Sequence, residues 1–329
     1  MAGASFDADR TYAEVQTWFR KRPLREFLNL GRSPLERICL DWLAKSGKRF
    51  RPFLVAAVYQ ALQEQPEALP PAVRKTAVAV ECIHKASLIY DDVQDRDAER
   101  YGEKAVYAVH GVPVALTAAL YLLGQGYRLI ADCGATAEQR TRMLALATAG
   151  HRDLCLGQSR ELMWMRRPTP MAVEEVLDLF RWKTAPSFEV VLRLPAILAD
   201  APAEVEEALK NYSLALGVGY QIQDDLSDLN TLDEPDDVAA RRPSIVMAAA
   251  YARARGRARN RLRRAWCGKA NRATLAAARK LVSQTGAEQE ARELLRRYKH
   301  AAYDALRPLK SLDLKALLCR LADKVLPQS

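Results

Sequence analysis

Apolar residues recur along most of the chain at the three- and four-residue spacing of amphipathic helices. Strict alternation of apolar and polar residues, which would indicate strands, is scarce, and Ala, Leu, Arg and Glu dominate the periodic segments. We therefore predict an all-α protein. The predicted helices span residues 9–29, 34–45, 50–64, 71–95, 112–131, 137–165, 171–198, 202–229, 243–264, 271–282, 285–306 and 312–325.

Proline and glycine mark the boundaries between these helices. Ser33 and Pro34 begin one helix, whereas Pro168 and Pro170 break the chain between two long ones. No Gly/Ser/Pro-rich linker divides the sequence, so we expect one large helical bundle, a single domain over residues 1–329. No apolar run reaches 18 residues, and we expect no transmembrane helix.

Three carboxylates close the predicted helix 71–95, whose last part reads ECIHKASLIYDDVQD. Asp91 and Asp95 are four residues apart and project from one helix face, with Asp92 beside them. Carboxylates at the end of an apolar helix are costly unless a cation neutralises them. Magnesium suits this role, because it takes a few carboxylates together with substrate phosphates.

The same spacing recurs at the end of the predicted helix 202–229, which reads YQIQDDLSD. One such motif is usually a solvated acidic turn. Two of them, each closing an apolar helical run, favour a pair of magnesium sites that grip a diphosphate between them. The carboxylates of the second motif are Asp224, Asp225 and Asp228.

Several further motifs accompany the acidic pair, in an order that resembles the trans-isoprenyl (polyprenyl) diphosphate synthase family. They are GKRFRP from Gly47, the His84 that precedes the first acidic motif, GQSRE from Gly157, and Lys183 with Thr184. The resemblance runs from about residue 30 to residue 250. It implies the isoprenoid synthase fold, a large helical bundle around a central cavity. It also implies a homodimer.

The resemblance implies two diphosphate substrates and three magnesium ions. An allylic prenyl diphosphate would sit on the magnesium ions, and isopentenyl diphosphate would sit on Lys48, Arg51 and His84. Guanidinium groups bind phosphate oxygens in pairs, which suits Arg51. His84 lies seven residues, or two helical turns, before Asp91 and so on the same face.

The remaining matches to the family's site residues are Arg100, Gln158, Lys183, Thr184 and Gln221. By resemblance, Lys183 would hold the leaving diphosphate and Thr184 would steady the carbocation. Gln221 would face the reacting carbons. The implied reaction ionises the allylic diphosphate, the double bond of isopentenyl diphosphate attacks the cation, and the departing diphosphate takes a proton. A dry pocket is needed, because water would quench the cation.

Three features depart from the family's pattern. The family's paired arginines are Arg100 and Tyr101 here, which removes one expected cationic contact to isopentenyl diphosphate. A Gly-Asp pair is Gly124-Gln125, and the loop after Asp228 is short and lacks a lysine, for which Arg241 or Arg242 would have to substitute.

Small residues precede the first acidic motif. Ala86 and Ser87 lie five and four residues before Asp91, where bulky side chains would close the pocket after a short chain. We therefore predict products of about twenty carbons or more, an estimate from helix geometry. Tyr121 and Tyr127 are candidates for a lower pocket floor, although each is more often plain core.

The formal net charge is +10, and a run of seven arginines supplies much of it: Arg253, Arg255, Arg257, Arg259, Arg261, Arg263 and Arg264. No aromatic residues interleave for base stacking, so we expect no nucleic acid partner. A solvated helix face is the simplest interpretation, and peripheral membrane contact is the better alternative. Six scattered cysteines and the lack of an apolar leader favour reduced thiols in a cytoplasmic protein.

Three functions fit these features. The first is a chain-elongating prenyl transferase. The second is a terpene synthase or cyclase that ionises a prenyl diphosphate without isopentenyl diphosphate, which Tyr101 favours and Lys48, Arg51 and His84 oppose. The third is a non-catalytic subunit of a heteromeric prenyl synthase, although such a subunit should have lost carboxylates that this chain keeps.

Overall fold

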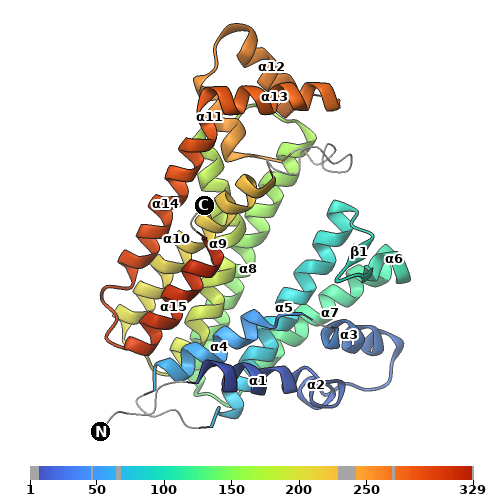
Figure 1. Ribbon diagram of the computed structural model, residues 1–329. Coiled ribbons are helices and arrows are strands. Elements are labelled where there is room, and N and C mark those ends of the chain that lie inside the picture. Colours follow the sequence, from blue (N-terminus) through green and yellow to red (C-terminus); the bar gives the residue numbers. More distant parts are fainter. Residues whose placement is uncertain (1–6, 46, 64–67, 229–241, 269–270, 328–329) are drawn as a thin grey trace. The chain divides into compact units, whose positions relative to one another are not determined.

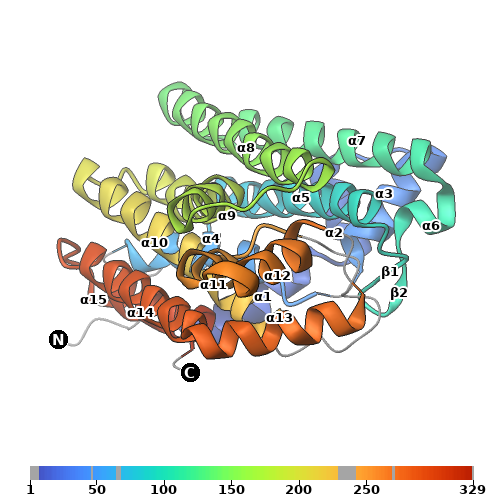
Figure 2. The same ribbon diagram turned by 90° about the horizontal axis from the view of Figure 1, so that it is seen from above.

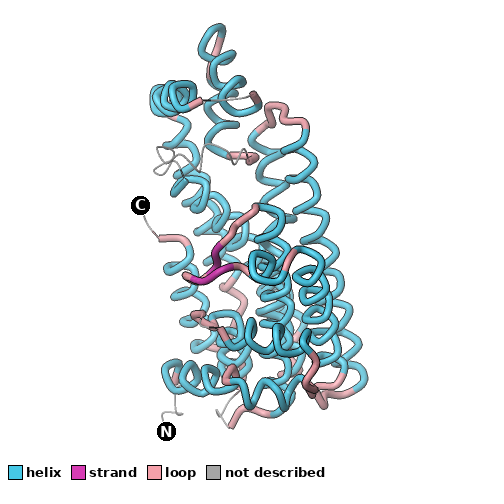
Figure 3. The backbone as a smooth tube through the Cα atoms, turned by 90° about the vertical axis from the view of Figure 1, so that its right-hand side faces the viewer, coloured by secondary structure: helices cyan, strands magenta, loops and turns pink. Residues whose placement is uncertain are grey.

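The computed structural model describes residues 7–45, 47–63, 68–228, 242–268 and 271–327. These residues are almost entirely helical, and Figure 3 shows the strands of one short hairpin among the helices. The all-α prediction is confirmed. The contacts group into two compact units, which are described separately below. The single domain over residues 1–329 and its central cavity stay predictions.

The first unit comprises Met1–Thr148, Val191–Glu206 and Ser311–Leu317. Its elements are α1 (Ala8–Trp18), α2 (Lys21–Leu28), α3 (Pro34–Ala44), α4 (Phe50–Ala61), α5 (Pro71–Asp95), β1 (Glu99–Arg100), β2 (Glu103–Lys104), α6 (Val106–His110) and α7 (Val112–Ala131) (Figure 1).

Helices α5 and α7 lie side by side and form the core of the first unit (Figures 1 and 2). Gly126 allows this close contact, since a Cβ atom there would lie 2.6 Å from the Ile83 side chain. Cys82, Ile89 and Leu122 are fully buried in this core. By length and composition alone, α7 is able to cross a bilayer, a test that core helices of soluble proteins also pass.

The second unit comprises Ala149–Val190, Glu207–Lys310 and Leu318–Ser329. Helix α11 packs on α14, and α12 lies beside α13 (Figures 1 and 2). Helices α8 (Ala137–Arg166), α9 (Val173–Leu198), α10 (Ala203–Asp228) and α15 (Leu312–Val325) each have residues in both units. The others are α11 (Ile245–Arg253), α12 (Gly256–Cys267), α13 (Arg272–Thr285) and α14 (Ala287–Ala305).

Most predicted helices are confirmed, and several agree at both ends. The helix predicted over residues 9–29 is wrong, because α1 ends at Trp18 and α2 begins at Lys21. Pro23 lies in the first turn of α2, where backbone N–H groups have no partner within the helix and a missing one costs nothing. In one continuous helix over residues 9–29, the same proline would lie in the interior and remove a backbone hydrogen bond. The helix predicted over residues 243–264 is also wrong, since Ala254 and Arg255 are extended between α11 and α12.

A small hairpin and the five-residue helix α6 follow α5 and were not predicted. Strands β1 and β2 pair antiparallel, with Arg100 opposite Glu103. The two turn residues, Tyr101 and Gly102, have φ angles of 59° and 74°. Such a turn matches the twist of a hairpin but favours Asn or Asp before Gly, so Tyr101 conceals it in the sequence.

Candidate functional site

The first acidic motif forms the last turn of α5, in the first unit. Asp91 is half-buried, Asp92 is buried and Asp95 is exposed. Arg96 ends the helix in the left-handed conformation, which turns the chain toward the hairpin. The end of α5 therefore carries the three carboxylates at different depths.

Arg100 on β1 holds the buried carboxylate. Its Nε donates to Oδ1 of Asp92 at 2.7 Å, while Oδ2 of Asp92 is buried without a hydrogen-bond partner among the described residues. Burial raises the pKa of Asp92, and the Arg100 guanidinium opposes that rise. An orphaned carboxylate oxygen fits a cation ligand. Arg100 thus lies beside the acidic motif, and its role as a substrate-binding residue stays a prediction.

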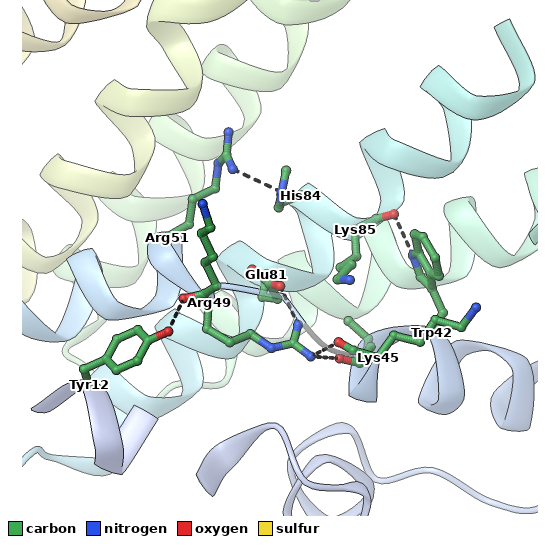
Figure 4. Close-up of polar contacts among 10 residues, drawn as sticks. Tyr12, Trp42, Lys45, Arg49, Arg51, Glu81, His84 and Lys85 are labelled. Atoms are coloured by element: carbon green, nitrogen blue, oxygen red, sulfur yellow. Dashed lines mark hydrogen bonds and ion pairs between the residues drawn. The ribbon is translucent and has the colours of Figure 1, made fainter. Parts of the chain in front are cut away.

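The predicted basic group lies on α4, on the loop before it and on α5 (Figure 4). An N–H of Arg51 lies 3.1 Å from Nε2 of His84. Burial, followed by the charge of Arg51, lowers the pKa of His84 well below its ordinary value. At neutral pH the imidazole is therefore neutral, and its Nε2 accepts from Arg51. Lys48 is exposed on the loop, and its carbonyl accepts from the hydroxyl of Tyr12 at 3.0 Å.

A buried ion pair that the sequence analysis missed fixes this loop. Nη1 of Arg49 lies 2.6 Å from Oε1 of Glu81, and each residue is 4% exposed. The other guanidinium nitrogen donates to the carbonyls of Leu43 and Lys45. Arg49 has a left-handed backbone, with φ of 44°, at the turn between the Lys48 loop and the start of α4, which carries Arg51. Glu81, a lone acid on a buried turn of α5, was the signal for this pair.

In the second unit, α9 carries Lys183 and Thr184, both of which are largely buried. Nζ of Lys183 lies 2.6 Å from Oε2 of Glu161 on α8, and this carboxylate is buried. Gln158 is half-buried on α8, one residue beyond Gly157. The middle motifs of the sequence therefore meet around the Lys183 ammonium.

Two glycines bring the neighbouring helices against this turn of α9. A Cβ at Gly157 of α8 would lie 2.6 Å from the backbone N of Lys183. A Cβ at Gly217 of α10 would lie 2.5 Å from the Cα of Ala185. Any side chain at either position would push the helices apart. The backbone of Lys183 to Ala185 is thus held between α8 and α10.

The second acidic motif forms the last turns of α10. Oδ2 of Asp225 accepts from the amides of Ile245 and Val246, at 2.5 and 3.3 Å, and from the Ser244 hydroxyl at 3.1 Å. These groups belong to the start of α11, whose N-cap is Ser244, so Asp225 adds an acceptor for the first two amides of that helix. Burial raises the pKa of Asp225 to about 7, against the effect of these hydrogen bonds.

Asp224 and Gln221 lie on the same helix, the first exposed and the second half-buried. Although the residue as a whole is exposed, partial desolvation of its carboxyl raises the pKa of Asp224, and the charges of Lys183 and Arg242 oppose this rise. Arg242, one of the two proposed substitutes for the missing lysine, thus has an electrostatic effect on Asp224, and its role as that substitute stays a prediction. The other, Arg241, lies outside the described residues, and Asp228 is exposed.

In the described residues, the carboxylates of neither acidic motif surround a metal site on their own. Among the residues that the structure describes, no three Asp, Glu, His or Cys side chains gather closely enough to hold a metal ion. Magnesium does not require such a cage, because it keeps waters and shares its ligands with substrate phosphates. The donor set fits this ion. The assignment of the six aspartates and their convergence on one diphosphate stay predictions.

Gln125 belongs to a polar network between α7 and α3. Its amide donates to the Tyr121 hydroxyl at 2.9 Å and accepts from Arg128 at 2.8 Å. The Tyr121 hydroxyl in turn donates to Glu36 at 3.3 Å. Gln125 and Tyr121 thus tie α7 to the start of α3, and a pocket-floor role for Tyr121 stays a prediction.

The helices of this chain have the all-α isoprenoid synthase fold. The family model for polyprenyl synthetase matches residues 32–283, which is most of the chain. The chain therefore belongs to the polyprenyl synthetase family.

Curated relatives include a short chain isoprenyl diphosphate synthase of Methanocaldococcus jannaschii, 34% identical over 57% of this chain and 55% of that protein. A geranylgeranyl pyrophosphate synthase of Geoglobus acetivorans is 30% identical over 60% of each. The chain thus matches less than two thirds of the length of these relatives.

Solved structures share the fold. The geranylgeranyl pyrophosphate synthase of Corynebacterium glutamicum, complexed with isoprenyl diphosphate and magnesium, has a TM-score of 0.82 at 22% identity. This match covers 98% of this chain and all of the other.

Proposed function

We propose that the protein is a magnesium-dependent prenyl transferase that condenses an allylic diphosphate with isopentenyl diphosphate, head to tail. One observation carries the proposal: the Arg51–His84 contact lies on the same face of α5 as the first acidic motif. A binding group for a second diphosphate is needed only if two diphosphates react. Membership of the polyprenyl synthetase family supports the same reaction.

Lys48, Arg51 and His84 would bind the diphosphate of isopentenyl diphosphate. The neutral imidazole accepts from Arg51 and so orients the guanidinium. The guanidinium of Arg51 would then bind the substrate oxygens, and its paired donors suit a diphosphate. The Arg49–Glu81 ion pair keeps Lys48 and Arg51 at a fixed spacing without touching substrate.

Lys183 would hold the diphosphate that leaves the allylic substrate, with Glu161 keeping its ammonium in place. As the allylic C–O bond breaks, both electrons pass to the diphosphate, and the isopentenyl double bond forms the new C–C bond. The leaving diphosphate then accepts the proton that is lost. Thr184 and Gln221 would line the path of the cation, and Gln158 would lie near the Lys183 ammonium.

Magnesium, when bound, would neutralise the diphosphate as negative charge builds on it. Asp91, Asp92 and Asp95 would hold it on one side, and Asp224, Asp225 and Asp228 on the other. The partly unsatisfied Asp92 supports the first assignment. We propose three ions per site.

The product would have about twenty carbons or more, on the helix geometry that places Ala86 and Ser87 below the reacting end. Ala86 is fully buried and Ser87 is exposed, with its hydroxyl donating to the His84 carbonyl. Ala86→Phe should shorten the product, with chain length read by mass spectrometry after dephosphorylation. A product of unchanged length would remove the pocket argument.

The main experiment supplies the purified protein with magnesium, labelled isopentenyl diphosphate and one allylic primer at a time, from dimethylallyl to geranylgeranyl diphosphate. Label in a longer prenyl alcohol is the expected result. Hydrocarbon released from the primer alone, without label, would instead indicate a terpene synthase. No magnesium-dependent binding of any primer would indicate a non-catalytic subunit.

A homodimer and a cytoplasmic location belong to the same proposal. The exposed apolar side chains of α6 and α7, among them Val109, Val112 and Leu120, would be covered by a second copy. Leu120, 61% exposed, is central to this row, so Leu120→Glu should convert dimer to monomer in analytical ultracentrifugation. None of the six cysteines, all of which lie in the described residues, forms a disulfide, which is compatible with a reducing compartment.

The basic segment around α12 would touch an anionic membrane surface. No Asp or Glu lies between Pro243 and Ala287, whereas this stretch holds eleven Lys and Arg residues. Arg257, Arg261 and Arg264 recur at i, i+4 and i+7 on the exposed side of α12. Charge-reversed Arg257, Arg261 and Arg264 should abolish sedimentation with phosphatidylserine vesicles while turnover is unchanged. Retained sedimentation would contradict this contact.

A further inference from the structure

Lys85 on α5 is a buried cation without a hydrogen-bond partner among the described residues. It is 1% exposed, although lysine is rarely buried unless it is paired. Its Nζ lies 4.7 Å from the ring centroid of Trp42 and 4.1 Å from that of Tyr101. The indole N–H of Trp42 donates to the Lys85 carbonyl at 2.9 Å, which fixes that ring (Figure 4). Two aromatic faces thus enclose the ammonium.

Tyr101 reaches this position from the tip of the hairpin. Its φ of 59° lies in the left-handed region, which is strained for an aromatic residue. The residue is 43% exposed, while its ring lies against the Lys85 ammonium. A strained residue persists where its surroundings hold it, and here the cation–ring contact does so. Tyr101 therefore acts as a cover over Lys85.

The neighbouring charges are already paired. Lys45, at the end of α3, lies 2.8 Å from Glu103, while Arg49 is paired with Glu81. Arg100 is paired with Asp92. Lys85 is the member of this group that has no carboxylate at salt-bridge distance among the described residues. The residues that the structure describes thus leave its charge without a carboxylate partner.

The proposed site of the second diphosphate lies within reach of this charge. Lys85 directly follows His84 on α5, and the Arg51 guanidinium contacts the His84 imidazole at 3.1 Å. The enclosed ammonium, the cover and the Arg51–His84 contact therefore share one electrostatic neighbourhood. A charge that is kept from water acts over a longer range than an exposed one.

We propose that Lys85 is a positioning residue for isopentenyl diphosphate: its ammonium, kept dry by Trp42 and Tyr101, strengthens anion binding at Lys48, Arg51 and His84. This inference rests on the proposed function. It also accounts for Tyr101, which provides no cation of its own but shields one. An arginine at position 101 would bring a positive charge to the hairpin, and in this protein Lys85, which lies against the Tyr101 ring, supplies that charge instead.

The test compares Lys85→Met with Lys45→Met in the full-length protein. Lys45 lies over the same Trp42 ring, at 5.6 Å, but is paired with Glu103, so it is a matched control. Lys85→Met should raise KM for isopentenyl diphosphate by about tenfold, as for loss of one close charge. Its kcat and its KM for the allylic primer should stay within about twofold, and Lys45→Met should change none of them.

Two further readouts separate an electrostatic role from a structural one. Burial lowers the pKa of Lys85 to about 8, which Glu81 opposes and Arg49, Lys45 and Arg100 reinforce. Above that pH the wild-type KM for isopentenyl diphosphate should rise, and in Lys85→Met the rise should disappear. Adding Tyr101→Arg to Lys85→Met should restore most of the affinity.

Binding of inorganic pyrophosphate, measured by calorimetry, keeps this inference separate from the proposed function. If wild type incorporates no label but Lys85→Met still weakens pyrophosphate binding about tenfold, the function fails and the inference stands. If Lys85→Met binds pyrophosphate as wild type does, the inference is overturned. If Lys85→Met does not fold, Tyr101→Ala is measured in its place. Pyrophosphate binding by Tyr101→Ala with the affinity of wild type would also overturn the inference.

Discussion

The two acidic helix ends share one spacing but lie in different surroundings. At the end of α5, Asp92 is held by the side chain of Arg100 and keeps one oxygen without a hydrogen-bond partner in the described structure. At the end of α10, Asp225 accepts from the backbone that begins α11. One carboxylate is held by a charge and the other by a helix N-terminus.

This difference separates two kinds of constraint. A guanidinium can exchange a carboxylate for a metal-bound phosphate without unfolding anything. The amides at the start of α11 have no such freedom, because losing Asp225 leaves those of Ile245 and Val246 without their acceptor, although Ser244 still caps the helix. We infer that the first end is arranged mainly for ligands, and that the second supports the fold and the site together.

The largest expected effect tests whether both ends serve one reaction. Asp91→Ala and Asp224→Ala should each lower kcat by about a thousandfold or more, since magnesium supplies several kcal/mol of charge stabilisation. Label incorporation from isopentenyl diphosphate measures the rate. Circular dichroism of both variants should match wild type, because neither residue caps a helix. Wild-type turnover in either variant would refute the magnesium assignment at that end.

The next effect compares the buried ion pair behind each end. Glu81→Gln leaves Arg49 buried without its countercharge and should cost about 3–5 kcal/mol of unfolding free energy. Glu161→Gln leaves Lys183 without its countercharge, but this ammonium is closer to solvent than Arg49. The loss of unfolding free energy should therefore be clearly smaller than in Glu81→Gln, whereas the loss of turnover should be larger. Urea titrations and steady-state rates decide. Equal losses of stability would mean that both pairs are structural.

Helix periodicity was enough to predict most of the fold. Helices α5 and α7 agree with the sequence at both ends, because Pro71 and the Gly111–Pro113 segment mark their starts. Hairpin β1–β2 was missed, since two-residue strands have no period and Tyr101 is an unusual turn residue. Short elements held by tertiary contacts leave no periodic signal.

The candidate site was predicted where a motif placed several residues on one helix face. Arg51 and His84 are on different helices, and only the resemblance joined them before the structure placed them 3.1 Å apart. Lys85, Trp42 and Tyr101 escaped notice, because cation–ring contacts between distant segments have no sequence spacing. The second role of Asp225, accepting from the first amides of α11, likewise depends on a tertiary contact.

A smaller effect separates the two middle carboxylates directly. Asp225→Ala leaves the Ile245 and Val246 amides at the start of α11 without their acceptor and should lower the unfolding free energy by about 1–2 kcal/mol. Asp92→Asn keeps the shape and an acceptor for Arg100, and it should change stability by less than about 1 kcal/mol. Urea midpoints of metal-free protein measure both. If Asp92→Asn lost more unfolding free energy than Asp225→Ala, the end of α5 and not that of α10 would be the one that supports the fold.

The smallest effect concerns Glu36, a second carboxylate that accepts from amides beside a helix start, but in an exposed position. Its oxygens accept from the amides of Gly31 and Ser33, and these hydrogen bonds lower its pKa to about 2. Because the folded-state pKa is depressed, the stabilisation is present above pH 4.5, the ordinary pKa, and is lost as pH falls toward 2. Glu36→Gln should remove part of that pH dependence. Urea midpoints at both ends of this range would show it, and an unchanged pH profile in the variant would mean that the exposed hydrogen bonds contribute nothing to stability.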